Sequence, residues 1–303
     1  MALITVLLVV AVLTAIIGRL TLANQVWVRQ VEGGAAAAQA DQAGRAVQQW
    51  VALILARDDN AFDGHTDIWA RPLPPLPVGW GELSGRIEDL QGRFNLNSLV
   101  TAKGEADPDA VLRFRRLLRI LDLNPGIADA VVDWIDPDSR PRGSWGAEDS
   151  FYAGRSEPYL AANRPLGTAA ELRLVRGIDA DVWRKLRPQV TALPQATGIN
   201  VNTATPEVLA AAVTQWGPPL TALQQGKRWA RETDGRPFRE VGAFLQEAAG
   251  AEEGKAVPGL TVTSEYFMAH AQLKFASVER RITTLYHRGQ GPVRIVRQRR
   301  ELR

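Results

Sequence analysis

The 303-residue sequence contains no cysteine, which excludes disulfide bonds, thiolate metal sites and cysteine nucleophiles. Histidine is also scarce: His65, His270 and His287 are far apart in the chain, so a histidine-rich zinc site is not expected. A nucleophile elbow, a phosphate-binding P-loop and an HExxH metal motif are missing too. These absences argue against the enzyme classes that depend on such groups. They also leave any long exported loop without a disulfide to hold it.

A strong excess of charge of one sign is missing as well. The formal net charge is +3 with a pI of about 9.4, and the last ten residues alone hold five arginines. A basic surface over the whole protein, as expected of a nucleic-acid-binding protein, is therefore not implied. With 46% hydrophobic and 23% charged residues, the chain is predicted to fold around a packed core, as one large domain or two to three modest ones.

Proline is absent before Pro72, and the chain opens on a long apolar run. Residues 1–18 are interrupted only by Thr5 and Thr14 and would span about 27 Å as a helix, close to the ~30 Å hydrocarbon core of a membrane. Because no positive charge precedes this run, a membrane-inserting helix is favoured over a cleaved signal peptide. It is also favoured over a buried core helix, which would rarely start at the very N-terminus.

The helical pattern continues beyond Arg19 as an amphipathic segment. Apolar residues recur there near helical spacing, and polar residues fill the gaps. This stripe consists of Leu20, Val26, Val31, Ala38, Ala46, Trp50 and Leu53. One helix of about fifty residues is therefore predicted, which anchors in a membrane and then lies against a globular head.

Two β-rich regions lie on either side of a helical middle part. Residues 71–81 read as a proline-rich breaker, and residues 82–99 read as two short strands around a turn near Asp89–Gly92. Residues 264–302 contain three β-rich runs, the first two joined near Ser277. The pattern between the two regions is helical and rich in Ala, Leu and Arg.

This arrangement predicts an α+β fold in which one sheet is built from both ends of the chain and an α-helical domain is inserted between its strands. The expected segments are the N-terminal helix at 1–55, the first part of the head with a β-hairpin at 56–97, the inserted domain at 98–258 and the last strands at 259–303.

The inserted part contains internal echoes. Residues 93–100 and 198–209 share a pattern of two asparagines separated by an apolar residue and followed by Ser or Thr. In this pattern Asn97 and Asn202 are placed to cap the helices that follow.

Residues 120–134 and 171–186 resemble helix-hairpin-helix modules. In the nucleic-acid-binding versions, a second glycine follows the first by two residues and the backbone N–H groups hold a phosphate. Here Ala128 and Asp179 take that place, and Asp179 would repel a phosphate. These modules are therefore predicted to pack helices. The alternative, a membrane-tethered helix-hairpin-helix protein that binds DNA, would reveal itself by salt-dependent DNA binding.

Five carboxylates crowd one aromatic-rich loop of the insert: Asp133, Asp136, Asp138, Glu148 and Asp149. Acids packed this closely repel one another unless a cation joins them. No Cys or His is nearby, and hard oxygen ligands suit Ca²⁺. The spacing is not that of an EF-hand. A calcium site is therefore predicted.

Within this site, Asp136, Asp138, Glu148 and Asp149 are the principal candidate ligands, with backbone carbonyls of residues 150–152 completing the shell. Asp133 is a further candidate that could instead cap or pair with Arg140.

Two alternatives remain open for the acids. One is a solvated loop without metal. The other is a glycosidase in which Asp136 and Glu148 act as acid and base. Another acidic cluster consists of Asp58, Asp59, Asp63 and Asp67.

The chain resembles the minor pseudopilin K family of the type II secretion system, a group of type IV pilin-like proteins. The resemblance lies in "MALITVLLVVAVLTA", where Thr5 replaces the glutamate usual in pilins, and in "DWIDPD", "GAEDSFY" and "ANRPL" of the acidic loop. It implies a type IV pilin-like fold, a long N-terminal helix plus an antiparallel sheet, with a large all-α domain inserted between strands. It also implies calcium in the inserted domain.

The resemblance further implies a non-enzymatic subunit at the tip of the pseudopilus, in complex with the minor pseudopilins I and J, that primes assembly. Other expected partners are the pseudopilus itself, the inner-membrane assembly platform and the membrane, but not nucleic acid. The protein is then expected in the bacterial inner membrane with a single span and its head in the periplasm.

Overall fold

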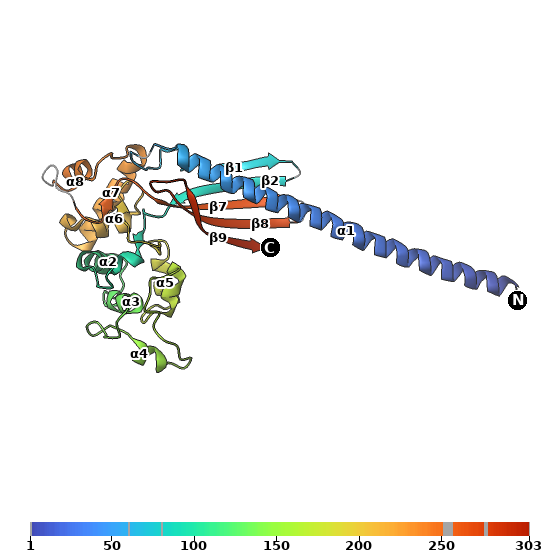
Figure 1. Ribbon diagram of the computed structural model, residues 1–303, viewed down its shortest axis with the longest axis horizontal. Coiled ribbons are helices and arrows are strands. Elements are labelled where there is room, and N and C mark those ends of the chain that lie inside the picture. The colour runs from blue at the N-terminus through green and yellow to red at the C-terminus, as the bar shows by residue number, and fades with distance from the viewer. Residues whose placement is uncertain (1, 60, 80, 251–256, 276–277, 303) are drawn as a thin grey trace.

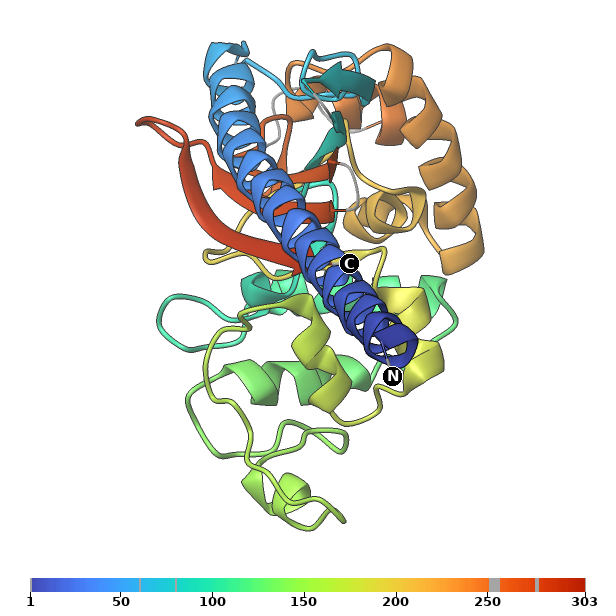
Figure 2. The ribbon, with the colours of Figure 1, turned by 90° about the vertical axis from the view of Figure 1, so that its right-hand side faces the viewer.

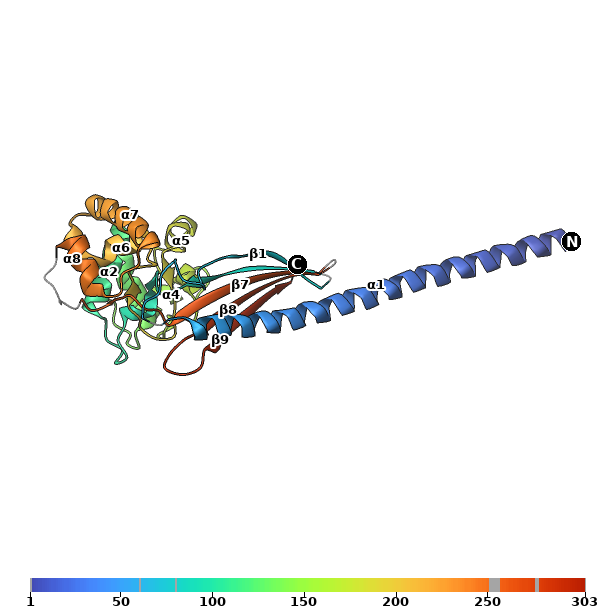
Figure 3. The ribbon, with the colours of Figure 1, turned by 90° about the horizontal axis from the view of Figure 1, so that it is seen from above.

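The computed structural model describes residues 2–59, 61–79, 81–250, 257–275 and 278–302. Helix α1 (Ala2–Arg57) extends far out of a globular head, and its N-terminal half runs free of the other elements (Figures 1 and 3). Its most apolar 18-residue window has a mean hydropathy of 2.6 and is 0% buried. The predicted helix of about fifty residues is thus confirmed, and its exposed apolar part is long enough to cross a membrane.

The head is built on a five-stranded antiparallel sheet in the order β1-β2-β7-β8-β9. Its strands come from both ends of the chain: β1 (Leu73–Val78), β2 (Gly81–Asp89), β7 (Tyr266–Phe275), β8 (Val278–His287) and β9 (Arg294–Leu302). The C-terminal half of α1 crosses one face of this sheet (Figure 2). The predicted α+β fold, with a long helix against a sheet made from both chain ends, is therefore confirmed. The turn predicted near Ser277 lies outside the described residues.

The face of α1 that packs on the sheet is made of small residues. The buried positions are Ala36, Ala40, Gly44, Val51 and Leu55. A Cβ on Gly44 would lie 2.6 Å from Cδ1 of Ile282, so any other residue at this place would require the Ile282 side chain to shift for the helix to approach β8 this closely. This face is not the apolar stripe that the sequence pattern identified. At 100° per residue, most of the predicted stripe points away from the sheet. Its members Val31, Trp50 and Leu53 are exposed by 51%, 45% and 45%.

The proline-rich stretch is not a breaker but strand β1, which forms one edge of the sheet. Its prolines Pro74, Pro75 and Pro77 lack the N–H that a central strand needs, and an edge position tolerates this loss. The two strands predicted around a turn near residues 89–92 are present, since β2 ends at Asp89 and β3 (Phe94–Asn95) follows, but they do not pair with each other. Strand β2 pairs with β1, which gives the antiparallel hairpin of this segment, and with β7, whereas β3 pairs in parallel with β4 (Val190–Thr191).

The inserted α-domain lies between β2 and β7, at the end of the sheet farthest from the N-terminus (Figure 1). Its largest core contains Phe114, Leu117, Trp134 and Leu209 and is separate from the smaller clusters under the sheet. Its further elements are η1 (Leu96–Leu99), α2 (Pro108–Ile120), α3 (Ile127–Ile135), α4 (Asp149–Ala153), η2 (Ala169–Leu174), α5 (Ala180–Leu186), β5 (Ile199–Asn200), α6 (Pro206–Ala212), η3 (Thr214–Trp216), α7 (Pro219–Gly235), α8 (Val241–Ala249) and β6 (Leu260–Thr261).

The two asparagine echoes play the same structural role in each half of the insert, but not the predicted one. Asn97 accepts a hydrogen bond from the N–H of Leu166 (2.8 Å) and donates to its carbonyl (2.9 Å). Asn202 makes the same pair of bonds with Phe238, at 2.8 and 2.9 Å. Each side chain therefore mimics a strand neighbour for a distant segment. The helix cap of η1 is Asn95, and that of α6 is Thr205.

In the second helix-hairpin-helix-like module, at residues 171–186, a carboxylate of the protein itself caps the last helix. Asp179 precedes α5 and accepts hydrogen bonds from the N–H groups of Asp181 and Val182, at 2.9 and 2.8 Å. These are amides of the kind that hold a phosphate in the DNA-binding versions. Because a carboxylate already occupies them, this module favours helix packing over phosphate binding.

Candidate metal centre

Three carboxylates of the acidic loop converge on one point. Asp136, Asp138 and Glu148 each offer a carboxylate oxygen within 4.8 Å of the others. Asp136 follows the last residue of α3, where an extended backbone (φ −69°, ψ 158°) takes the chain out of the helix. Glu148 immediately precedes α4 and is extended as well (φ −116°, ψ −172°). The end of one helix and the start of the next thus bring Glu148 close to Asp136 and Asp138, which lie ten or more residues earlier in the chain. These three residues are here called the acid cluster.

The acid cluster contains buried oxygen atoms that lack partners. Asp136 and Glu148 are 6% and 2% exposed. In the part of the chain that the structure describes, Oδ1 of Asp136 and both Oε atoms of Glu148 are buried and accept no hydrogen bond. Leaving a buried polar group unpaired costs about 1–3 kcal/mol, and more if the group is charged. A cation bound between these oxygens would remove that cost.

Burial and mutual repulsion raise the carboxyl pKa values of the cluster. Burial first, and then the charges of Asp133, Asp136 and Asp138, raise the pKa of Glu148 to about 7. Burial, with Asp138 and Asp133 next, raises the pKa of Asp136 to about 6. Both shifts have the direction expected of buried carboxylates that repel one another and are only partly offset by a nearby cation. Hard oxygens alone, with no nitrogen or sulfur donor, are the ligand set that Ca²⁺ prefers.

Asp133 is engaged elsewhere and does not join the three converging acids. Its carboxylate accepts hydrogen bonds from the backbone N–H groups of Arg142 (3.0 Å) and Ala147 (2.8 Å). It thereby closes the loop between α3 and α4 from inside. A Cβ on Gly146 would collide with this carboxylate, so the glycine is needed for the closure. Among the residues that the structure describes, Asp133 forms no ion pair with Arg140, whose backbone N–H donates to Asp138 (2.8 Å).

Asp149 and the carbonyl groups predicted as ligands have other places within this part of the chain. Oδ1 of Asp149 accepts a hydrogen bond from the N–H of Ala161 at 2.8 Å. Residues 150–152 lie in α4, which directs their carbonyls along the helix axis. Asn163 was not singled out from the sequence. It has a left-handed backbone (φ 45°) and a buried amide oxygen without a partner in the described ranges. The only sequence signal for it is that Asn tolerates this conformation.

The loop around the acid cluster has an aromatic core of its own. Trp134 packs edge-to-face on Tyr152 at 5.0 Å, and Tyr152 stacks on Tyr159 at 5.3 Å. Arg176 lies over the rings of Trp145 and Phe151, at 5.0 and 4.9 Å. Buried aromatic contacts therefore hold this part of the insert together, beside an acid cluster in which Asp136 and Glu148 are buried and Asp138 is exposed.

The other acidic cluster is paired with an arginine. Asp58, Asp63 and Asp67 also place oxygens within 4.8 Å of one another. Nη1 of Arg288 lies 3.0 Å from Asp58, and Nη2 lies 2.5 Å from Asp63. Asp59 accepts from the N–H of Ala61 instead. Even beside this arginine, burial raises the pKa of Asp63 to about 6.

A glycosidase site is not favoured by the surroundings of the acids. The larger clefts found among the described residues are lined by residues other than Asp136 and Glu148. A sugar chain needs such a cleft between its acid and its base. The acid cluster is therefore better suited to a cation than to a substrate.

Comparison with known proteins places this geometry in context. A family described as "Type II secretion system (T2SS), protein K" matches residues 92–195, which run from before β3 to beyond β4. The type II secretion system protein K of Aeromonas hydrophila is 32% identical over 309 residues, covering 95% of this chain and 92% of that protein. The protein of the same description from Pseudomonas aeruginosa is 41% identical over 223 residues, covering 69% of this chain and 66% of that protein.

A solved structure shares the fold. It is a chain in the crystal structure of the GspK-GspI-GspJ complex from the type 2 secretion system of enterotoxigenic Escherichia coli. The TM-score is 0.65 at 24% sequence identity, and the match covers 87% of this chain and 96% of that chain. At this identity the likeness concerns the fold alone.

Proposed function

Because the chain belongs to the type II secretion system protein K family, and is thus a minor pseudopilin of protein secretion, we propose that it occupies the pseudopilus tip. In this role it is non-enzymatic and forms a tip complex with the minor pseudopilins I and J that initiates pseudopilus assembly.

The observation that carries this proposal is the position of the inserted α-domain. It lies beyond the C-terminal end of α1, on the side of the head farthest from the N-terminus (Figures 1 and 3). In a filament whose N-terminal helices run parallel, this bulk would stand where the next subunit would have to stack. A subunit with such a domain fits only where nothing stacks above it, which is the tip.

Residue 5 supports the same position. By the resemblance to pilins, a glutamate at this place would pair with the N-terminal amine of the neighbouring subunit. The Thr5 hydroxyl instead donates to the carbonyl of Ala2 in its own helix, at 2.8 Å. Thr5 carries no charge that could pair with a neighbour's amine. We therefore expect no such pair between this chain and a subunit ahead of it, which suits the tip.

The exposed part of α1 supports the proposed membrane and pseudopilin partners. Residues 2–18 are exposed throughout and apolar except for their two threonines, as suits a single span of the inner membrane. The head would then lie in the periplasm, and the inner-membrane assembly platform would meet the same helix. We further propose that Ca²⁺ binds the acid cluster of Asp136, Asp138 and Glu148, with Asp149 and Asp133 adjoining, and stiffens the inserted domain.

The tip position is tested by labelling. Pseudopili isolated from cells that carry an epitope in the exposed loop at Lys103 of this chain should bind gold-labelled antibody at one end only. An epitope-tagged major pseudopilin serves as the control and should be labelled along the whole length. Gold distributed along the filament for the Lys103 epitope would contradict the tip position.

A charge on the outward face of α1 is expected to weaken assembly. Ala38 is exposed and lies on the face opposite to the buried Ala36 and Ala40. Ala38→Asp should therefore reduce co-purification with the other pseudopilins severalfold while the melting temperature stays unchanged, because a carboxylate cannot be buried cheaply between helices. Ala102→Asp, at an exposed alanine of the inserted domain, is the matched control. Equal recovery of partners with both variants would exclude this face as the interface.

A further inference from the structure

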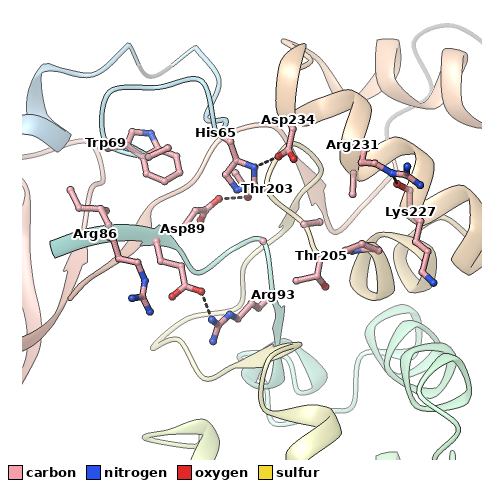
Figure 4. Close-up of a pocket in the computed structure, with 17 residues that line it drawn as sticks. His65, Trp69, Arg86, Asp89, Arg93, Thr203, Thr205, Lys227, Arg231 and Asp234 are labelled. Atoms are coloured by element: carbon pink, nitrogen blue, oxygen red, sulfur yellow. Dashed lines mark hydrogen bonds and ion pairs between the residues drawn. The ribbon is translucent and has the colours of Figure 1, made fainter. Parts of the chain in front are cut away.

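A cleft of about 600 Å³ opens where the sheet meets the inserted domain. Figure 4 shows it between the end of β2, the segment that carries His65 and Trp69, and the helices α6 and α7. It is distinct from the acid cluster, none of whose members lines it. Its volume is within the range of about 300–1,000 Å³ typical of ligand pockets.

One wall of this cleft is an open strand edge. The ladder between β1 and β2 ends at the pair Leu73–Gly85, whereas the ladder between β2 and β7 continues to Asp89. Residues 86–89 therefore have a strand neighbour on one side only. In the described part of the chain, no backbone hydrogen bond outside the strand ladders involves these four residues. Unpaired N–H and C=O groups of this kind are a template for an added strand.

The cleft also presents cations that have no acidic partner. Arg86 comes from β2, and Lys227 and Arg231 come from successive turns of α7. All three are exposed, and none of them forms an ion pair among the residues that the structure describes. Unpaired cations around a cleft attract a ligand of opposite charge.

The acids that line the cleft are already bound by other groups. Glu88 pairs with Arg93 and lies 3.5 Å from His270. Asp234 lies 2.5 Å from Nδ1 of His65 across the mouth of the cleft. Asp89 is buried and accepts hydrogen bonds from side chains, including Ser264 at 2.7 Å. The charge left for a ligand to meet is therefore positive.

We propose that this cleft binds an extended acidic segment of a partner protein, which adds to the open edge of β2 as a further strand. The carboxylates of this segment meet Arg86, Lys227 and Arg231, which supply selectivity, while main-chain hydrogen bonds to residues 86–89 supply register. A protein segment fits better than nucleic acid, because its main chain carries the N–H and C=O groups that pair with the open edge of β2, which a sugar–phosphate chain lacks. The proposal does not rest on the tip position.

Peptide binding to the full chain in detergent tests the charge requirement. The probe is a short fluorescent peptide of alternating valine and glutamate. We expect it to bind at least about tenfold more tightly than its valine–lysine counterpart. The double variant Lys227→Glu/Arg231→Glu should lower that affinity by about tenfold or more. The control Arg173→Glu/Arg187→Glu, at two exposed cations outside the cleft, should leave it unchanged.

Two further measurements separate strand addition from general attraction. The same acidic peptide with N-methylated amides keeps its charge but cannot donate main-chain hydrogen bonds, and it should bind markedly more weakly. Because the chain has no cysteine, Ala230→Cys places a single thiol at the cleft, and Ala170→Cys places one at an exposed site outside it. The acidic peptide should slow maleimide labelling of the first thiol only.

Several results would overturn the proposal. These are equal binding of the acidic and lysine peptides, equal losses in the test and control double variants, equal binding of the N-methylated peptide, or no protection at Ala230→Cys. Tighter binding of single-stranded DNA than of the acidic peptide would assign the cleft to nucleic acid instead.

Discussion

Calcium at a hundredfold excess over its Kd is expected to raise the free energy of unfolding by about 2.7 kcal/mol, since it binds the folded protein and not the unfolded chain. The reason is the acid cluster, where buried oxygens of Asp136 and Glu148 lack partners. For a chain of this size the gain corresponds to roughly 5–10 °C in Tm. Mg²⁺ should substitute poorly because it demands a tighter octahedral site. Thermal melting in calcium, magnesium and chelator measures the effect.

Glu148→Gln distinguishes a bound metal from a general salt effect. The substitution keeps the size of the side chain but removes a ligand charge, so most of the calcium-dependent rise in Tm should vanish. In chelator the variant should melt at least as high as the parent, because one of the mutually repelling acids is gone. Glu157→Gln, at an exposed acid of the same loop, should retain the full calcium effect. The same melting temperature with calcium and with chelator in the parent would return the acids to a solvated loop without metal.

The metal-free protein should also lose stability as pH rises. The pKa of Glu148 is raised from 4.5 to about 7 in the folded state, chiefly by burial. Folding therefore favours the protonated acid, and this contribution is complete below pH 4.5 and disappears as pH rises to about 7. In chelator, Tm should accordingly decline across this window, and the decline should be smaller in Glu148→Gln. A flat profile in both proteins would contradict the raised pKa.

Arg288→Met is expected to lower the free energy of unfolding by about 3–5 kcal/mol, because it leaves buried carboxylates without their cation. The Arg288 side chain is 5% exposed, and its guanidinium lies 3.0 Å from Asp58 and 2.5 Å from Asp63. It also donates to the carbonyl of Ser264 at 2.9 Å and lies over the ring of Phe267. It therefore joins the end of α1, the segment after it and two strands of the sheet. Chemical denaturation measures the loss.

Two comparisons show whether pairing, and not lost volume, causes that loss. Arg281→Met removes an exposed partner of Glu279 and should change stability by no more than about 0.5 kcal/mol. Arg288→Met/Asp63→Asn should be less destabilised than the sum of its single variants, because the removed charge no longer needs a partner. A loss for Arg288→Met no larger than for Arg281→Met would show that these acids are not held by the arginine.

Local signals in the sequence were sufficient for several features. Residues 2–57 form one helix because they hold no proline and no long run that disfavours helix, and tertiary contacts were not needed to identify it. The strand at 266–275 alternates between buried and less buried residues over much of its length, the period-two pattern by which a half-buried strand is recognised. The acid cluster was visible because its members are close in sequence and any compact loop brings some of them together.

Other features depend on partners that are far away in the chain, and only the tertiary structure decided them. Helix α1 packs closely on β7 and β8, and such a close approach favours small residues. The packed face therefore contains Ala36, Ala40 and Gly44, and the more hydrophobic stripe lies elsewhere. Strand β1 exists despite its prolines because β2 has a free edge there. Asp133 does not join the acid cluster because the path of the loop places the N–H groups of Arg142 and Ala147 on its carboxylate.

The clearest contrast is between the two acidic clusters, which look alike in sequence. Asp58 and Asp63 are paired with Arg288, more than two hundred residues away, because β8 ends beside them. Asp136, Asp138 and Glu148 receive no such arginine among the described residues, and their buried oxygens stay unpaired. The sequence by itself determined where the acids are concentrated. Only the fold decided which of the two acidic clusters has an arginine beside it, because electrostatic pairing depends on distance in space and not on separation along the chain.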